Sequence, residues 1–342
     1  MSRTERYLFS PGQVINGYSV ISLIGQGGYG DIYSVESDST EQYAMKVESI
    51  NSPKKGMCLE IEIMQKIQGH MHFPRLVCSG VTETHRFFVM ELLGPSISNI
   101  RRSMYSKKFS LSTTLRLSIF MLKCLSQFHL CGMLHRDIKP GNFLFKKGSS
   151  FPLKIIDYGL SRVFIDPKTG EPYPQRSRSG FRGTSKYASL SAHRNMELSW
   201  KDDIISWLYS IVELIDGKLP WLTGQNMETT EDAKNRISPR SLFSSLPGEF
   251  IDIWRYINMI NYHERPDYLY IEDLILRSIA KNSINALEPF DWEIPRNYRT
   301  KNSPYIDILP KSDEFAMFLN IPYSFHIAMD EYDRSRCGLC RI

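Results

Sequence analysis

Hydrophobic and polar residues follow two different periods along this chain, and the change of period divides it. From about Val14 to Val89 the apolar residues come in short alternating runs, interrupted by one stretch with helical spacing. Alternation with a period of two is typical of strands that bury one face. This part of the sequence therefore predicts a small, strand-rich unit that includes a helix.

From about Ser110 onward the period becomes that of an α-helix. Serine at position 110 suits a helix N-cap, and Gly132 suits a helix end. Between them, apolar residues recur every three or four positions, at Leu111, Leu115, Ile119, Leu122 and Leu125. The same spacing predicts further helices near residues 202–216, 249–260 and 271–281. The fold class is therefore α+β, with a larger helical unit after the strands.

Beyond Trp292 neither period continues. Prolines recur at 295, 304, 310 and 322. Apolar residues are nevertheless too frequent for a solvated tail, and they include Phe315, Met317, Phe318, Leu319, Phe325 and Ile327. We expect residues 293–342 to form a C-terminal extension that docks on the helical unit or on a partner.

The composition excludes several classes of protein. The chain has 342 residues and a net charge of +5, which is modest and argues against nucleic-acid binding. No apolar signal segment begins the sequence, and the longest apolar stretch, 204–215, is too short to span a bilayer. The cysteines form no disulfide framework, which fits a reducing compartment. We expect an intracellular protein, cytoplasmic or nuclear, that is monomeric and does not contact membranes.

Two cysteines near the C-terminus, Cys337 and Cys340, form a C-x-x-C pair. A complete zinc site needs four ligands, so this pair supplies at most half of one. Two ordinary thiols are the preferred interpretation.

The densest chemical motif is His135-Arg136-Asp137-Ile138-Lys139-Pro140-Gly141-Asn142, followed by Asp157-Tyr158-Gly159. It supplies a carboxylate, an ammonium group and two oxygen ligands in the order that phosphoryl transfer requires. The alternative is a solvated charged loop. Five fixed residues would match by chance at about one position in a million, so the chemical interpretation is favoured.

A glycine-rich turn lies upstream, in the run Gly25-Gln26-Gly27-Gly28-Tyr29-Gly30-Asp31-Ile32. The pattern G-x-G-x-x-G alone is weak, since roughly one chain in ten of this length carries it by chance. A Rossmann dinucleotide site would need a helix after the glycines. Here residues 32–35 alternate like a strand, and glycines let the backbone approach phosphate oxygens closely. The sequence predicts a glycine turn between two strands, not a Rossmann turn.

One lysine stands inside the apolar run Tyr43–Val47. A buried ammonium group is costly without a partner, so Lys46 needs a carboxylate or a ligand. The helix predicted from about 58 to 67 offers Glu60 and Glu62, and its periodicity does not decide between them. A purely structural ion pair is the alternative to a role of Lys46 in ligand binding.

The motif at 135–142 and 157–159 resembles the catalytic loop and metal-binding turn of eukaryotic protein kinases. The middle residue of the turn is tyrosine instead of phenylalanine, which keeps an aromatic ring for packing. The resemblance implies that Asp137 orients the substrate hydroxyl and takes its proton, and that Lys139 steadies the transferring phosphate. It implies that Asn142 and Asp157 hold magnesium ions. A lysine at position 139 is similar to Ser/Thr kinases.

The kinase resemblance also implies a bilobal fold, with a small β-rich N-lobe at about 14–90 and a larger helical C-lobe at about 95–292. Residues 1–13 would precede this domain, and ATP would bind between the lobes. Alignment by eye with the family favours Glu62 as the partner of Lys46. The implied ATP-binding residues are Ile24, Gly25, Gln26, Gly27, Gly28, Tyr29, Gly30, Ile32, Lys46, Glu62, Met90, Glu91 and Leu93.

Further segments narrow the resemblance. Residues 89–96 look like the hinge of the casein kinase 1 group, and residues 180–189 look like its substrate-side segment, which lacks Ala-Pro-Glu. The run Gly180–Thr184 and residues 109–117 look closest to the tau-tubulin kinase branch. Ser191 departs from that pattern, where asparagine is expected. The resemblance covers roughly Val14 to Trp292.

The group generally needs no phosphate on the loop between Asp157 and Gly180, so constitutive activity is implied. Arg182 and Lys186 match positions linked to a preference for acidic or already phosphorylated substrates. A solvated basic loop is the alternative interpretation of these charges. Asp203 is expected to cap the helix that follows it, and the resemblance implies that it also bonds the catalytic-loop backbone.

We therefore expect a serine/threonine protein kinase that uses ATP and Mg²⁺ and acts on protein substrates. The alternative is a catalytically silent pseudokinase scaffold. It is disfavoured because the whole catalytic set is present, namely Lys46, Asp137, Lys139, Asn142 and Asp157. A small-molecule kinase is disfavoured because residues 180–189 look like a peptide-side segment.

Overall fold

The computed structural model describes residues 9–27, 30–52, 56–221, 227–294, 297 and 308–319. The chain divides into two compact units. Unit 1 comprises residues up to 69 together with 74–93, and unit 2 comprises residues 70–73 and everything from 94 onward. In the described ranges, each helix lacks either the length or the hydrophobicity to cross a membrane.

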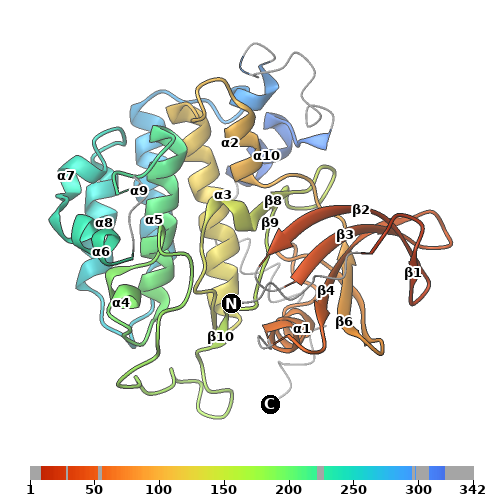
Figure 1. Ribbon diagram of the computed structural model, residues 1–342. Helices are drawn as coiled ribbons and strands as arrows, with labels where there is room; N and C mark the ends of the chain where they lie inside the picture. Colours follow the sequence, from red (N-terminus) through yellow and green to blue (C-terminus); the bar gives the residue numbers. More distant parts are fainter. Residues whose placement is uncertain are drawn as a thin grey trace. The chain divides into compact units, whose positions relative to one another are not determined.

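Unit 1 is a six-stranded antiparallel sheet with a helix (Figure 1). Its strands run in the order β1-β2-β3-β4-β6-β5. Their bounds are β1 Val14–Ile15, β2 Tyr18–Gly27, β3 Gly30–Glu36, β4 Gln42–Ser49, β5 Leu76–Val81 and β6 His85–Glu91, and helix α1 spans Gly56–Lys66. The alternating apolar residues, including Val20, Val35, Met45 and Val89, pack into one core. The predicted strand-rich unit is confirmed.

Unit 2 is mainly helical. Its helices are α2 Ile97–Ser103, α3 Leu111–Leu130, α4 Leu190–His193, α5 Trp200–Asp216, α6 Met227–Arg236, α7 Pro239–Leu242, α8 Glu249–Met259, α9 Tyr268–Lys281 and α10 Ser312–Leu319. Short strands β7 Met133–Leu134, β8 Phe143–Phe145, β9 Leu153–Ile155 and β10 Arg162–Val163 lie near the catalytic motif, and 3-10 turns span Pro140–Asn142 and Asp291–Glu293.

Helix α3 is the centre of unit 2, with α5 and α9 packed along it (Figure 1). Every residue from Thr113 to His129 is buried, which is typical of a helix surrounded by protein on all sides. Ser110 caps its start, since the hydroxyl oxygen accepts a hydrogen bond from Thr113 N at 3.2 Å. The predicted long helix is confirmed, and its end delivers the chain to β7 and the catalytic motif.

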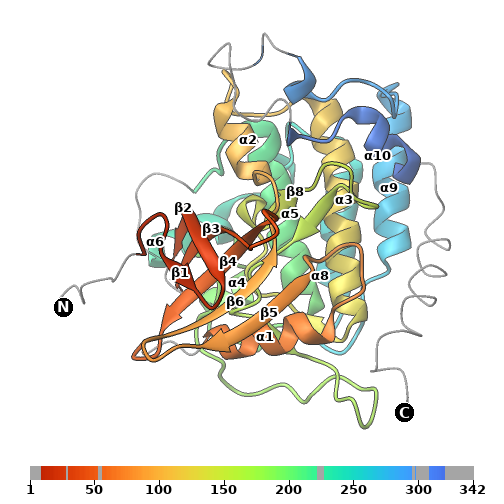
Figure 2. The same ribbon diagram turned by 90° about the vertical axis from the view of Figure 1, so that its right-hand side faces the viewer.

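The described part of the C-terminal extension packs within unit 2. Figure 2 shows α10 alongside α3, where the Phe315 ring lies 4.6 Å from that of Phe120, centroid to centroid. Phe315 also packs at 4.8 Å against Phe290. The packing of Phe315 thus explains part of the apolar pattern after Trp292. Residues 320–342, with Phe325, Ile327 and the Cys337–Cys340 pair, lie outside the described residues.

Candidate active site

The catalytic motif follows β7, which pairs with β10. Because β7 precedes and β10 follows the segment 135–161, their pairing holds both ends of this segment together. His135 is fully buried, and its Nε2 atom lies 3.0 Å from the Ile156 carbonyl oxygen. Its ring packs against Phe128 and against Tyr158, the aromatic residue of the metal-binding turn. Tyr158 therefore keeps the packing role that the exchange from phenylalanine predicts.

Asp203 holds the backbone of this loop. Its carboxylate accepts hydrogen bonds from His135 N at 2.7 Å and from Arg136 N at 2.8 Å. Arg136 has a left-handed backbone with φ 64°, a conformation that needs support from its surroundings. Burial raises the pKa of Asp203, but hydrogen bonds from His129 and the His135 backbone outweigh it and hold the pKa below its ordinary value. Asp203 thus stays ionised.

The partner of Asp203 inside the core is His129. Its Nε2 atom lies 2.9 Å from Asp203 Oδ2, and its Nδ1 atom lies 2.5 Å from the Tyr268 hydroxyl. Burial lowers the pKa of His129, so we assign a neutral ring that donates to Asp203 and accepts from Tyr268. A neutral histidine of this tautomer orients the carboxylate without adding a charge.

The expected capping role of Asp203 is wrong. The N-cap of α5 is Ser199, and its backbone N–H donates to Asp202 at 2.8 Å. Asp202 lies in the first turn, where a carboxylate satisfies the helix start. Asp203 is one residue further along, so its side chain points from the helix to the catalytic loop. Sequence spacing alone did not separate these adjacent aspartates.

Asp137 lies in a compact polar cluster with Lys139 and Thr184. Lys139 Nζ is 2.5 Å from Asp137 Oδ2, and the Thr184 hydroxyl donates to Asp137 Oδ1 at 2.7 Å. Lys139 Nζ also lies 3.2 Å from Thr184 Oγ1. Asp137 is buried, while the Lys139 side chain is 26% exposed. A carboxylate can accept a proton from a hydroxyl substrate, and the partly exposed ammonium group beside it can balance the negative charge that develops.

Thr184 was missed by the sequence analysis as a site residue. It comes from the segment 180–189, which the sequence linked to substrates without giving the threonine a role. Next to it, Gly183 has φ +97°, and a Cβ atom there would lie 2.5 Å from the Arg136 carbonyl oxygen. Only glycine allows this segment to approach the catalytic loop so closely.

Asn142 and Asp157 are brought together by a two-stranded ladder. Strands β8 and β9 are antiparallel, with Phe143 opposite Ile155. Asn142, which precedes β8, therefore lies at the same end of the ladder as the residues that follow β9. Ile156 N donates to Asn142 O at 2.9 Å. The Asn142 amide nitrogen donates to Asp137 O at 2.9 Å, which leaves the amide oxygen available as a ligand atom.

These oxygen donors fit magnesium. Mg²⁺ prefers one or two protein oxygens and completes its shell with water and substrate phosphate oxygens. The described residues contain no group of three or more His, Cys, Asp or Glu side chains arranged to hold a metal ion, so this pair is the donor set to be tested. Asp157 has φ 72°, a left-handed conformation for which aspartate is one of the better-suited residues.

In unit 1, β2 and β3 lie on either side of the glycine-rich segment and pair with each other. Gly25 pairs with Ile32, Gln26 with Asp31 and Gly27 with Gly30. A strand follows the turn, so the Rossmann alternative is wrong. Gly30 has φ +125°, and a Cβ atom would lie 2.4 Å from Val47 O. Gly28 and Tyr29, two of the predicted ATP-binding residues, lie outside the described residues.

Lys46 forms a buried ion pair with Glu60, at 2.7 Å between Nζ and Oε2. The preference for Glu62 is therefore wrong. The buried face of α1 contains Met57, Glu60, Ile63 and Met64, and Glu62 is exposed. Two residues along a helix correspond to a turn of about 200°, so Glu62 faces away from Lys46.

The remaining predicted ATP-binding residues lie on β2, on β6 and at the end of unit 1. Met90 is buried on β6, opposite Ala44 of β4. Glu91 Oε1 accepts from Arg75 N at 3.1 Å, and Leu93 is the last residue of unit 1. Half of the Ile24 surface is exposed on β2.

The two residues of the predicted anion pocket differ in their surroundings. Lys186 Nζ contacts the buried carboxylate of Glu213 closely, and Arg101 Nη2 reaches the same oxygen at 2.9 Å. The Tyr187 hydroxyl donates to the other Glu213 oxygen at 2.5 Å. Arg182 is exposed, and its Nη1 atom donates to Phe181 O at 3.1 Å. Lys186 is thus tied to a buried carboxylate that it shares with Arg101, which weakens its candidacy and leaves Arg182.

Comparison with known proteins agrees with this geometry. Residues 18–271 match the protein kinase domain. The chain belongs to the protein kinase family. The kinase also resembles a Dictyostelium discoideum protein named as a probable serine/threonine-protein kinase, with 34% identity over 296 residues. That match covers 84% of this chain and 59% of the relative, so the kinase spans about three fifths of that protein's length.

A second relative is the serine/threonine-protein kinase spe-6 of Caenorhabditis elegans. It is 30% identical over 327 residues, which cover 92% of this chain and 86% of the relative. The domain is therefore a protein serine/threonine kinase domain of the bilobal type, as the sequence predicts. ATP and Mg²⁺ are the cofactors that this family uses in general.

Proposed function

We propose that this kinase transfers the γ-phosphate of ATP to serine or threonine of protein substrates without prior phosphorylation of its own loop. Many kinases order the loop after the metal-binding turn by pairing a phosphate with arginines. The observation that supports our proposal is a carboxylate, Glu197, that already pairs with arginines of this loop.

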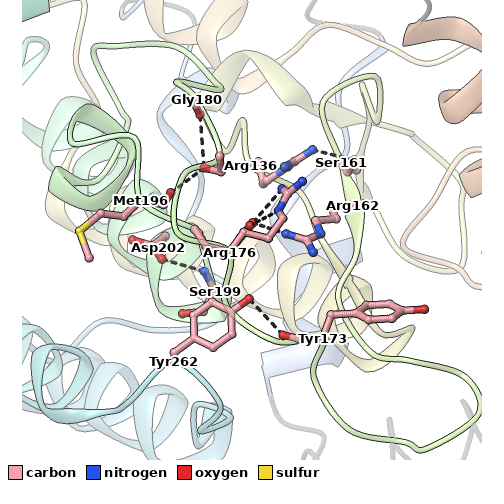
Figure 3. Close-up of polar contacts among 12 residues, drawn as sticks. Arg136, Ser161, Arg162, Tyr173, Arg176, Gly180, Met196, Ser199, Asp202 and Tyr262 are labelled. Carbon is pink, nitrogen blue, oxygen red and sulfur yellow. Dashed lines mark hydrogen bonds and ion pairs between the residues drawn. The ribbon is translucent and has the colours of Figure 1, made fainter.

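Glu197 lies between α4 and α5 and is 2% exposed. Arg162 Nη1 contacts its Oε1 atom, Arg176 Nε contacts its Oε2 atom, and Arg176 Nη2 lies 3.2 Å from Oε1. Figure 3 shows Arg162 and Arg176 converging on one carboxylate. Burial raises the pKa of Glu197, but the two guanidinium groups outweigh burial and keep the pKa below its ordinary value. The carboxylate supplies a permanent negative charge.

Arg136, which precedes Asp137, is also engaged without a phosphate. Its Nε atom donates to Leu160 O at 2.6 Å and its Nη2 atom donates to Ser161 O at 3.1 Å. The C-terminal end of the loop is also held in place, because the Ser179 hydroxyl donates to Met196 O at 2.7 Å (Figure 3). Three separate contacts thus support an ordered loop in the unmodified chain.

The chemistry follows from the polar cluster. Asp137 accepts the proton of the substrate hydroxyl, and Lys139 offsets negative charge at the transferring phosphate. When bound, Mg²⁺ held by Asn142 and Asp157 neutralises charge on the phosphates. The proposed ATP-binding residues, as far as they are described, are Ile24, Gly25, Gln26, Gly27, Gly30, Ile32, Lys46, Met90, Glu91 and Leu93.

Enzyme freed of phosphate should keep its activity. We expect phosphatase treatment, verified by mass spectrometry at Thr169, Ser177 and Ser179, to change kcat less than about twofold. Glu197→Gln removes the charge that two arginines share, which is worth about 1.5–3 kcal/mol per charge-assisted contact, so its kcat should fall about tenfold or more. A large loss of rate after phosphatase treatment would refute constitutive activity. No activity of the wild type on any peptide library would revive the pseudokinase scaffold.

We also propose that acidic or phosphorylated residues N-terminal to the target Ser or Thr raise kcat/KM through Arg182. Exposed ion pairs are worth up to about 1 kcal/mol, so a peptide with the anionic residue should be preferred about fivefold over its neutral pair. Arg182→Ala should abolish this preference, while Arg178→Ala, which removes another exposed charge of the same loop, should retain it. Equal rates within each peptide pair for the wild type would contradict the proposal.

Finally, we propose membership of the casein kinase 1 group, nearest its tau-tubulin kinase branch, and an intracellular, monomeric enzyme. The group assignment is supported by residues 89–96 and 180–189 of the sequence. The location is supported by Cys58, Cys78, Cys124 and Cys131, which are all free thiols, as expected in a reducing compartment.

A further inference from the structure

Lys234 is an unexpected buried charge in unit 2. It lies on α6 and is 5% exposed. Its Nζ atom donates to Ser185 O at 2.7 Å and to Ala188 O at 2.6 Å, and lies 3.2 Å from His193 Nε2. Its Nζ atom also lies 5.1 Å from the ring centroids of Tyr209 and Trp221. Among the described side chains, no carboxylate pairs with Lys234. Lys234 therefore binds backbone carbonyls where an ion pair would be expected.

These carbonyls belong to the segment that carries Thr184. Tyr187 N and Ala188 N donate to Thr184 O at 2.9 and 3.0 Å, so residues 184–188 form one hydrogen-bonded turn. Trp221 Nε1 donates to Lys186 O at 2.8 Å. One side of the turn is thus held by Lys234 and Trp221, while the Thr184 hydroxyl at the other side reaches Asp137.

Packing alone does not explain a lysine at this position. An apolar side chain would fit between two aromatic rings without the cost of removing an ammonium group from water. It would, however, leave the Ser185 and Ala188 carbonyls without these donors. Burial lowers the pKa of Lys234 to about 7, and both the ammonium and the neutral amine carry N–H groups for the two carbonyls. The contact thus persists in either protonation state.

We propose that Lys234 is a positioning residue for phosphoryl transfer, which fixes the 184–188 turn so that Thr184 stays bonded to Asp137. The proposal rests on the kinase activity of the domain and does not depend on whether the loop needs a phosphate. All variants are therefore compared in one phosphorylation state, and the concentration of active sites is taken from the stoichiometry of ATP-analogue binding.

The first test compares Lys234→Met, Lys234→Gln and Arg236→Met. Methionine keeps the length and the packing but removes the donors, so kcat per active site should fall about ten- to a hundredfold while KM for ATP stays within about twofold. Glutamine restores a neutral N–H donor and should recover part of kcat. Arg236, on the same helix with 82% of its side chain exposed, serves as the control and should match the wild type. Wild-type kcat in Lys234→Met, or equal losses in the Met and Gln variants, would overturn the proposal.

The second test asks whether Lys234 acts through Thr184, and it does not require the methionine variant to fold. Lys234→Gln is combined with Thr184→Ala in a double-mutant cycle of kcat. If the lysine works by placing the threonine, its substitution should have little further effect, below about twofold, once the threonine hydroxyl is gone. Full additivity of the two losses would show that Lys234 is only a structural residue, and the positioning role would be discarded.

Discussion

Replacing Asp137 with asparagine should leave the fold and nucleotide binding intact and reduce phosphoryl transfer by about 10²–10⁴-fold. The carboxylate accepts from Lys139 at one oxygen and from Thr184 at the other. An amide offers only one oxygen, so it cannot serve both donors, and it is too weak a base to take the proton of the substrate hydroxyl. Steady-state kcat on a peptide substrate measures phosphoryl transfer. Binding of an ATP analogue measures whether nucleotide binding is intact.

The control for this prediction is Glu171→Gln, which removes an exposed carboxylate from the neighbouring loop. It should retain wild-type kcat. Unchanged kcat in Asp137→Asn would show that Asp137 has no role in proton transfer. Loss of ATP-analogue binding in the same variant would instead place its effect on nucleotide binding or folding.

Asp157→Ala should lose metal-dependent activity, by about a hundredfold or more, since a metal ion supplies several kcal/mol of stabilisation to the transferring phosphate. Alanine fits the left-handed backbone at position 157 less well than aspartate, so a backbone effect adds to the loss of the metal ligand. Asp157→Asn separates the two causes, because asparagine tolerates the same conformation but carries no charge. Activity of each variant is measured against Mg²⁺ concentration.

If the charge of Asp157 holds the metal, both variants should be inactive at Mg²⁺ concentrations that saturate the wild type. The asparagine variant should regain some rate at high Mg²⁺ because its amide oxygen remains a weak ligand. A wild-type Mg²⁺ response in Asp157→Asn would exclude Asp157 as a metal ligand. Inactivity of alanine alone would assign the effect to the backbone.

Local patterns predicted the elements of this kinase well, because each depends on neighbours in the sequence. The apolar spacing from Leu111 to Leu125 lies within the observed helix α3, and Ser110 caps it. The catalytic motif is contiguous, so its residues come together through one loop and one short ladder. Lys46 was recognised because a charge inside an apolar strand needs a partner.

The predictions that were wrong, and the residues that the sequence did not reveal, depend on three-dimensional contacts. Glu60 and Glu62 differ only in helical phase, which the structure fixes through the buried face of α1. Glu197 and Lys234 contact residues that lie 21 and 46 positions away in the sequence, respectively, at Arg176 and Ala188. Neither has a local pattern that distinguishes it from a surface charge, because burial at these positions is created by the packing of distant elements.

The pairing of Glu197 with two arginines has a consequence for the control of this enzyme in the cell. A phosphate can be added and removed within seconds, but a carboxylate encoded in the gene is present from synthesis to degradation. If Glu197 orders the loop as we propose, no upstream enzyme can turn this kinase on or off at that place. Its output would then be set by its abundance, by its location and by which substrates reach it.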